Sequence, residues 1–286
     1  MSLASDNLRS NFKKGDDIRD EGLTTPEDVI RFNDIPYGTE KLDLYKPKDA
    51  EGKLPVIISV HGGGWVYGDK ERYQYYCLSL AERGFSVVNF TYRLAPEAKF
   101  PAALEDTNLV ARWVLENAEQ YSLDTNNIFA VGDSAGAHYL SLYAAILTNP
   151  EYAKGYPFKV PEGFRLKAIA LDCGAYSLST PDTKLLMKDL LPGGGTPEEL
   201  SFIIPLDYIT HGYPPVFYFT APGDFLKSDA PKLGAKLMEK DVRHEFRYFT
   251  SPEEHLGHVF NLNIRSKAAK ECNDAQAAFF RQFLDA

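Results

Sequence analysis

Short apolar runs rich in β-branched residues alternate with longer stretches in which apolar residues recur three and four positions apart. The short runs are typical of buried strands, and the longer stretches are typical of helices with one apolar face. Strands separated by helices favour a mostly parallel central sheet with helices on both faces. The predicted strands cover residues 55–59, 86–92, 128–131, 166–171, 216–220 and 245–249, the predicted helices cover 73–82, 102–119, 135–147, 230–240 and 267–284, and an initial hairpin joins 29–35 to 41–45.

Two segments do not follow this alternation. Residues 1–30 are polar and are predicted to form a helix or an extended arm ahead of the hairpin. Residues 176–213 form an insertion between two predicted strands, and their Leu, Ile and Phe side chains favour a packed cap, with a short helix at 185–191, over a disordered linker. We therefore expect one domain over residues 1–286, with an N-terminal arm and a small cap insertion.

The composition excludes several classes of protein. The chain has 286 residues, of which 44% are hydrophobic and 25% are charged, as in ordinary globular proteins. With 31 Lys and Arg against 40 Asp and Glu the net charge is −9, and the longest basic run is Lys13 followed by Lys14. A nucleic-acid partner or an anionic membrane partner is therefore not expected.

The sequence also bears on the cell compartment and on cofactors. No apolar stretch approaches the roughly 20 residues that span a bilayer, and the first residues lack the basic and apolar regions of a secretory signal. The three cysteines, Cys77, Cys173 and Cys272, show no C-x-x-C spacing, which favours buried free thiols over disulfides or a zinc site. We expect a cytoplasmic protein that uses no metal and no other cofactor.

The clearest chemical motif is Gly132-Asp133-Ser134-Ala135-Gly136, which lies between a predicted strand and a predicted helix. In such a turn the serine is exposed at the start of the helix, and the glycines let the neighbouring backbone come close. The helix N-terminus offers unpaired N–H groups where negative charge develops. Ser134 is therefore a candidate nucleophile, and the alternative is that it only caps the helix.

A second motif, the segment HGGGW at residues 61–65, directly follows a predicted strand. Three consecutive glycines cost conformational entropy unless backbone N–H groups must be aimed at a target. The target predicted here is the oxyanion of a tetrahedral intermediate, held by N–H groups of this loop and of Ala135. A flexible turn is the alternative interpretation.

A serine nucleophile needs a histidine base, and the histidine needs a carboxylate to orient it. Both partners are expected on loops that follow late strands. Asp224 is the favoured acid, and Asp172, at the end of the preceding strand, competes with it. His258 is favoured as the base because Gly257 before it allows a close approach, whereas His255 lies beside two glutamates. The other histidines, expected to be structural, are His61, His138, His211 and His244.

The two glycine motifs, together with YRLAPE at 92–97 and FPAALED at 100–106, resemble the α/β-hydrolase superfamily and, within it, the hormone-sensitive-lipase-like esterases. The similarity is close from about residue 54 to 148 and looser beyond. It implies an α/β-hydrolase fold, although the helical N-terminal cap of these esterases is hardly visible in residues 1–30. The residues implied by the resemblance are Ser134 as nucleophile, Asp224 and His258 as its partners, and Gly63, Gly64 and Ala135 as oxyanion donors.

The motifs and the resemblance together predict a serine carboxylesterase that hydrolyses short-chain or aryl esters through an acyl-enzyme on Ser134. Trp65, beside the glycine run, is a candidate substrate-binding residue. The insertion also resembles that of carbohydrate acetyl or feruloyl esterases and aryl formamidases, which are the alternative enzymes. A serine peptidase or a binding module with a decayed triad are the other rivals. The expected partner is a small-molecule ester, and the expected state is a monomer or a homodimer.

Overall fold

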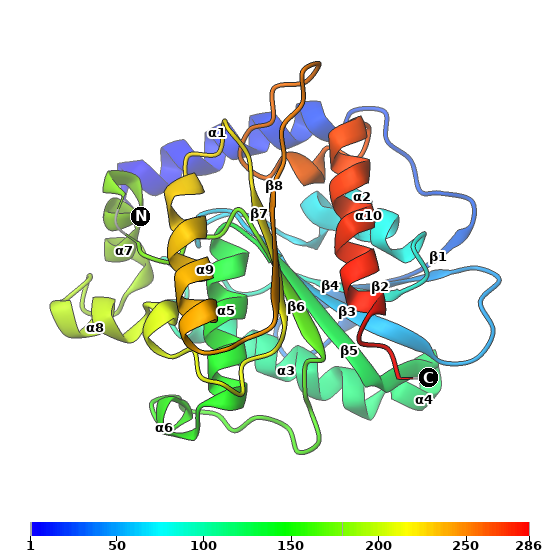
Figure 1. The fold of residues 1–286 in the computed structure, drawn as a ribbon, viewed down its shortest axis with the longest axis horizontal. Helices are drawn as coiled ribbons and strands as arrows, with labels where there is room; N and C mark the ends of the chain where they lie inside the picture. Colours follow the sequence, from blue (N-terminus) through cyan, green and yellow to red (C-terminus); the bar gives the residue numbers. More distant parts are fainter. Residues whose placement is uncertain (1, 179, 286) are drawn as a thin grey trace.

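The chain folds around one eight-stranded sheet with the strand order β1-β2-β4-β3-β5-β6-β7-β8 (Figure 1). The computed structural model describes residues 2–178 and 180–285. β1 and β2 form an antiparallel hairpin, β2 pairs antiparallel with β4, and every other pair of neighbours is parallel. The strands are β1 (Val29–Pro36), β2 (Lys41–Pro47), β3 (Leu54–Val60), β4 (Ser86–Phe90), β5 (Leu123–Asp133), β6 (Ala168–Asp172), β7 (Val216–Thr220) and β8 (His244–Tyr248).

Helices cover both faces of this sheet, with α2 and α10 on one face and α3, α5 and α9 on the other (Figure 1). The helices are α1 (Leu3–Asp20), α2 (Lys70–Ala81), α3 (Ala102–Glu116), α4 (Ala118–Tyr121), α5 (Ala135–Thr148), α6 (Pro150–Ala153), α7 (Pro181–Leu190), α8 (Pro197–Phe202), α9 (Ala230–Glu239) and α10 (Lys267–Arg281). Short 3-10 turns cover Pro205–Asp207, Lys227–Asp229 and Phe260–Leu262.

The apolar runs become strands that are buried on both faces. Every residue of β4, β6 and β7 is buried, as expected for parallel strands covered by helices on each side. One apolar cluster includes Tyr76 of α2 and Phe280 of α10, and the other includes Leu104 of α3 and Tyr143 of α5. The mostly parallel sheet predicted from the sequence, with the fold of an α/β-hydrolase, is therefore confirmed.

The predicted elements differ from the observed ones mainly at their ends. The strand predicted at 128–131 extends over Leu123–Asp133, because its first two residues, Leu123 and Asp124, pair with Leu54 and Pro55 of β3. The helix predicted at 102–119 is divided at Asn117, whose φ of −107° and ψ of 10° end α3 before α4 begins. Strand pairing sets the first boundary and backbone conformation sets the second, and the apolar pattern of the sequence reports neither.

The polar N-terminal segment forms the 18-residue helix α1, which lies across one end of the sheet and contacts α7 (Figure 1). Arg9 fixes it by an ion pair of 2.7 Å with Glu97 and by hydrogen bonds to two backbone carbonyl oxygens. The helix predicted at 185–191 begins earlier, as α7, because Thr180 caps it and Pro181 starts it. The division into one domain with an arm and a cap stays a prediction.

Candidate active site

Ser134 lies on the turn between β5 and α5, with a φ of 50° that is strained for a residue with a side chain. Its N–H donates to the carbonyl oxygen of Asp172 at 2.9 Å. A Cβ on Gly136 would lie 2.1 Å from the Val60 oxygen, and a Cβ on Gly132 would lie 2.7 Å from the Gly136 oxygen. Both glycines are therefore required by close backbone packing around the strained turn.

The glycine loop adopts a conformation that favours glycine, with φ of 119° at Gly63 and 61° at Gly64. Within residues 2–178 and 180–285, the N–H groups of these two glycines have no hydrogen-bond acceptor. The N–H of Ala135 opens α5, so it has no partner inside the helix. Three N–H groups are thus available to a negative oxygen, and their role as oxyanion donors stays a prediction.

Asp133 connects the glycine loop to the turn that carries Ser134, a role that the motif alone did not indicate. Its Oδ1 accepts the Gly62 N–H at 3.0 Å, and its Oδ2 accepts the Tyr73 hydroxyl at 2.8 Å. The side chain is buried, and burial raises the pKa of its carboxyl to about 6. Asp133 therefore holds the start of the glycine loop in place, and its carboxyl gains a proton at a higher pH than an ordinary aspartate does.

The raised pKa of Asp133 predicts a measurable pH dependence of stability. Between the ordinary pKa of 3.8 and the folded value of about 6, the native state holds more protons than the unfolded state, so stability falls as the pH rises. Asp133→Asn cannot ionise and should not show this loss. As the pH rises from about 4 to about 7, we expect the unfolding free energy of the variant to increase by about 3 kcal/mol relative to that of wild type. Urea denaturation at both pH values measures this gain, and a constant difference would show that Asp133 ionises at no cost.

Asp224 and His258 meet in the structure although 34 residues separate them. Oδ1 of Asp224 accepts the Nδ1–H of His258 at 2.6 Å and the Leu226 N–H at 2.9 Å, while Oδ2 accepts the Thr220 hydroxyl at 2.6 Å. Burial alone would raise the pKa of Asp224, but these hydrogen bonds outweigh it and hold that pKa below its usual range. The ionised Asp224 thus fixes the proton on Nδ1 and leaves the lone pair on Nε2 of His258.

The competing acid and base have other surroundings. Asp172 is buried, and its carboxyl contacts Tyr76, Asn261 and Gln276. Burial raises the pKa of Asp172 well above its ordinary value. Its hydrogen bonds link the end of β6 to α10 and to the loop after His258. His255 is exposed to solvent. The structure therefore pairs Asp224 with His258 and gives Asp172 a supporting position.

Cys173 is a further neighbour of this pair that sequence reasoning treated only as a buried thiol. It has a φ of 47°, and its thiol lies between the carboxyl of Asp224 and the backbone N–H of Val259. Among the described residues, ligand atoms of Cys173, Asp224 and His258 form one group within 4.8 Å of one another. The prediction that the protein uses no metal stays a prediction.

Two of the remaining histidines are buried and neutral. The ring of His61 stacks on Tyr92 with centroids 3.9 Å apart, and burial lowers its pKa to about 4. His138 accepts the indole N–H of Trp65 on Nδ1 at 3.1 Å and donates from Nε2 to the Ile203 oxygen at 2.8 Å. Burial lowers the pKa of His138 to about 4 as well. His138 thus connects the glycine loop to the 176–213 insertion.

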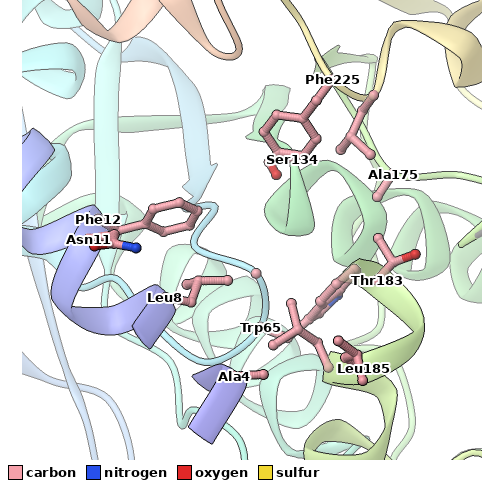
Figure 2. A pocket seen from close by; sticks show the side chains of 13 residues that line it. Ala4, Leu8, Asn11, Phe12, Trp65, Ser134, Ala175, Thr183, Leu185 and Phe225 are labelled. Atoms are coloured by element: carbon pink, nitrogen blue, oxygen red, sulfur yellow. The ribbon is translucent and has the colours of Figure 1, made fainter. Parts of the chain in front are cut away.

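Two cavities meet at Ser134 and share Asn11, Phe12 and Phe225. The larger one, of about 400 Å³, is drawn in Figure 2, where side chains of α1 lie opposite Ser134 and Phe225. The smaller one, of about 270 Å³, is reached by His258. Trp65, the candidate substrate-binding residue, lines the larger cavity, and its role in binding stays a prediction.

Helix α1 supplies part of both cavity walls, which the sequence did not indicate. Ala4, Leu8 and Phe12 are spaced four residues apart and all line the larger cavity. This apolar stripe is the feature of the sequence that could have predicted a helix packed against the rest of the protein. It is short and lies among charged residues, so the polar composition of residues 1–30 concealed it.

Comparison with known proteins places the chain in a family. A family model described as BD-FAE matches residues 42–226, which is more than half of the chain. The chain belongs to this family. The matched region contains the glycine loop, Ser134 and Asp224, whereas α1 and His258 lie outside it.

Several curated relatives of this BD-FAE protein are esterases. Carboxylesterase NlhH of Mycobacterium tuberculosis is 36% identical, over 92% of the chain and 87% of the relative. The versiconal hemiacetal acetate esterase of Dothistroma septosporum is 28% identical, over 71% of the chain. The chain spans 66% of that esterase and 49% of esterase LipQ, so it covers less than two thirds of these relatives. The hormone-sensitive-lipase-like resemblance is confirmed.

Solved esterase structures share the fold. Esterase B from Lactobacillus rhamnosis has a TM-score of 0.89 at 23% identity and covers 98% of the chain and 95% of its own. The carboxylesterase EstE1 from a metagenomic library has a TM-score of 0.79 at 26% identity, with both chains fully covered. In the described part of this family member, no helix is both long enough and apolar enough to span a bilayer.

Proposed function

We propose that the protein is a serine carboxylesterase that hydrolyses short-chain or aryl carboxylic esters through an acyl-enzyme on Ser134. The observation that carries the proposal is the 2.6 Å hydrogen bond from His258 to Asp224, beside a cavity that His258 and Ser134 both line. Because this bond holds the proton on Nδ1, Nε2 of His258 can accept a proton from Ser134. The esterase relatives support the same activity.

The proposed reaction proceeds in two steps. Oγ of Ser134 attacks the ester carbonyl carbon while His258 takes its proton, and the N–H groups of Gly63, Gly64 and Ala135 bind the negative oxygen. His258 then gives the proton to the alcohol oxygen as the C–O bond breaks, which leaves the acyl group on Ser134. A water molecule, deprotonated by His258, attacks the carbonyl carbon of this acyl-enzyme, and His258 returns the proton to Oγ of Ser134 as the C–O bond to the serine breaks and the carboxylic acid leaves. These residues supply each proton transfer, so the proposal includes no cofactor.

We also propose the partner, the oligomeric state and the cell compartment of the enzyme. Its partner is a small-molecule ester, and nucleic acid is not a partner, in keeping with the net charge of −9. We propose a monomer or a homodimer located in the cytoplasm. Gel filtration with light scattering tests the oligomeric state.

A panel of substrates tests the proposed chemistry. The larger cavity of about 400 Å³ is lined by Leu8, Trp65 and Leu186. We expect kcat/KM for p-nitrophenyl butyrate to exceed that for the decanoate by about tenfold or more, because overpacking a cavity of limited volume is costly. Release of p-nitrophenol measures both. An aryl formamide and an acetylated xylose complete the panel. Faster turnover of either would favour the alternative enzymes, and silence throughout would favour a binding module.

A further inference from the structure

The side chain of His138 joins the first turn of α5 to the glycine loop and to the 176–213 insertion. The backbone N–H of His138 donates to the Ser134 carbonyl oxygen at 3.1 Å, so the residue lies one helical turn beyond the candidate nucleophile. Its ring is bonded to the indole N–H of Trp65 at 3.1 Å and to the Ile203 carbonyl oxygen at 2.8 Å. The side chains of His138, Trp65 and Ile203 are all buried. His138 is therefore a fixed connection between three parts of the candidate site.

The two partners determine which nitrogen of the His138 ring carries the proton. An indole N–H can only donate, so Nδ1 must accept, and a carbonyl oxygen can only accept, so Nε2 must donate. Only the neutral ring with its proton on Nε2 meets both requirements. Burial lowers the pKa of His138 to about 4, which keeps the ring in this neutral form at neutral pH. A side chain at this position must therefore offer one acceptor and one donor.

Trp65 has a backbone conformation that requires support from its surroundings. Its φ of 66° lies in the left-handed region and is strained for a residue with a side chain. Such strain persists only where the surrounding structure fixes it. The indole bond to His138 provides this support, together with the bond from the Ala95 N–H to the Trp65 carbonyl oxygen at 3.1 Å. Because Trp65 directly follows Gly64, a change in its conformation turns the adjoining peptide groups of the glycine run.

We propose that His138 is a positioning residue of the reaction, which holds Trp65 and thereby keeps the N–H groups of the glycine loop directed at the oxyanion. Its bond to the Ile203 carbonyl oxygen extends this restraint to the 176–213 insertion. The insertion also forms part of the wall of the larger cavity through Leu185 and Leu186. Its position therefore acts on substrate access and, through His138, on the chemical step. The inference rests on the proposed serine esterase mechanism and adds a residue that lines neither cavity.

Two substitutions at His138 separate positioning from packing. His138→Leu leaves the indole N–H and the Ile203 oxygen without this partner, whereas His138→Gln offers one acceptor and one donor. On p-nitrophenyl acetate we expect His138→Leu to lower kcat by about ten- to hundredfold, the scale of a misplaced oxyanion donor, with KM within about threefold. His138→Gln should recover kcat to within about threefold of wild type. Rates are expressed per active site, counted by reaction with a p-nitrophenyl alkylphosphonate, so that unfolded protein does not contribute.

Inhibition by a trifluoromethyl ketone reports on the oxyanion donors directly. Oγ of Ser134 adds to the ketone carbon, His258 takes the serine proton, and the ketone oxygen becomes an anion beside the glycine loop. We expect Ki to rise in His138→Leu by the same factor by which kcat/KM for the acetate falls. Trp65→Phe removes the indole N–H and keeps an aromatic ring, so it should change both quantities in the same direction and provides the test if His138→Leu does not fold. Added to His138→Leu it should have little further effect, because both substitutions break one hydrogen bond.

Tyr213→Phe is the matched control. The Tyr213 hydroxyl also joins the insertion to α5, by donating to the Ser141 carbonyl oxygen at 3.0 Å, and this bond does not involve the glycine loop. Its kcat and Ki should stay within about threefold of wild type. Wild-type kcat and Ki in His138→Leu, a loss confined to KM, no recovery in His138→Gln, or an equal loss in Tyr213→Phe would overturn the positioning role while the esterase activity stands. A wild type no faster than Ser134→Ala would overturn the proposed function itself.

Discussion

Ser134→Ala is expected to lower kcat on p-nitrophenyl butyrate by about 10⁶-fold, because a triad that acts as a unit loses nearly all of its effect with its nucleophile. The variant has no oxygen at the turn between β5 and α5 to attack the carbonyl carbon. Steady-state release of p-nitrophenol at high enzyme concentration measures the residual rate.

A matched serine on the same helix controls for folding. Ser141 is buried in α5 and donates to the Ala137 carbonyl oxygen, away from both cavities. Ser141→Ala should therefore retain kcat within about threefold. If Ser134→Ala kept activity within tenfold of wild type, Ser134 would be removed from the mechanism.

His258→Ala is expected to lower kcat by a similar factor of about 10⁶, because in the proposed mechanism His258 takes the proton from Ser134. The structure provides a matched histidine three residues earlier. His255 is exposed, whereas His258 donates to Asp224 and packs against the Phe225 ring with centroids 4.1 Å apart. His255→Ala should keep nearly full activity. The opposite order of the two variants would exchange their roles.

The fold was predictable because the apolar pattern is local. Parallel strands buried on both faces appear in the sequence as short β-branched runs, so β4, β6 and β7 were located within two residues at each end. The turn that carries Ser134 was also predictable, because the strand, the five-residue motif with two glycines and the helix follow one another directly in the sequence. The pairing of Asp224 with His258 depends on Thr220, Leu226 and the bridge between Gly223 and Gly257. The order of residues along the chain limited the candidates for the acid and the base, and only the tertiary contacts show which two side chains meet.

The role of α1 could not be predicted from local patterns. Arg9 fixes the helix through Glu97, 88 residues away, and Arg19 reaches the Arg72 carbonyl oxygen. Interactions between such distant charges leave no periodic signal in the sequence. The carboxyl of Asp133 is a second example, because burial in the folded protein raises its pKa although the hydrogen bonds from Tyr73 and Gly62 lower it. Both features require the assembled structure.

Covalent labelling tests the central claim most directly. A p-nitrophenyl alkylphosphonate forms a P–O bond with a reactive serine Oγ as p-nitrophenolate leaves, and it imitates the tetrahedral intermediate. We expect mass spectrometry of the digested protein to find one phosphonate group, on Ser134, with loss of activity in proportion to labelling. The His258→Ala protein should be labelled far more slowly. Inactivation with the phosphonate on another residue, or full hydrolysis by a protein that is never labelled, would contradict an acyl-enzyme on Ser134.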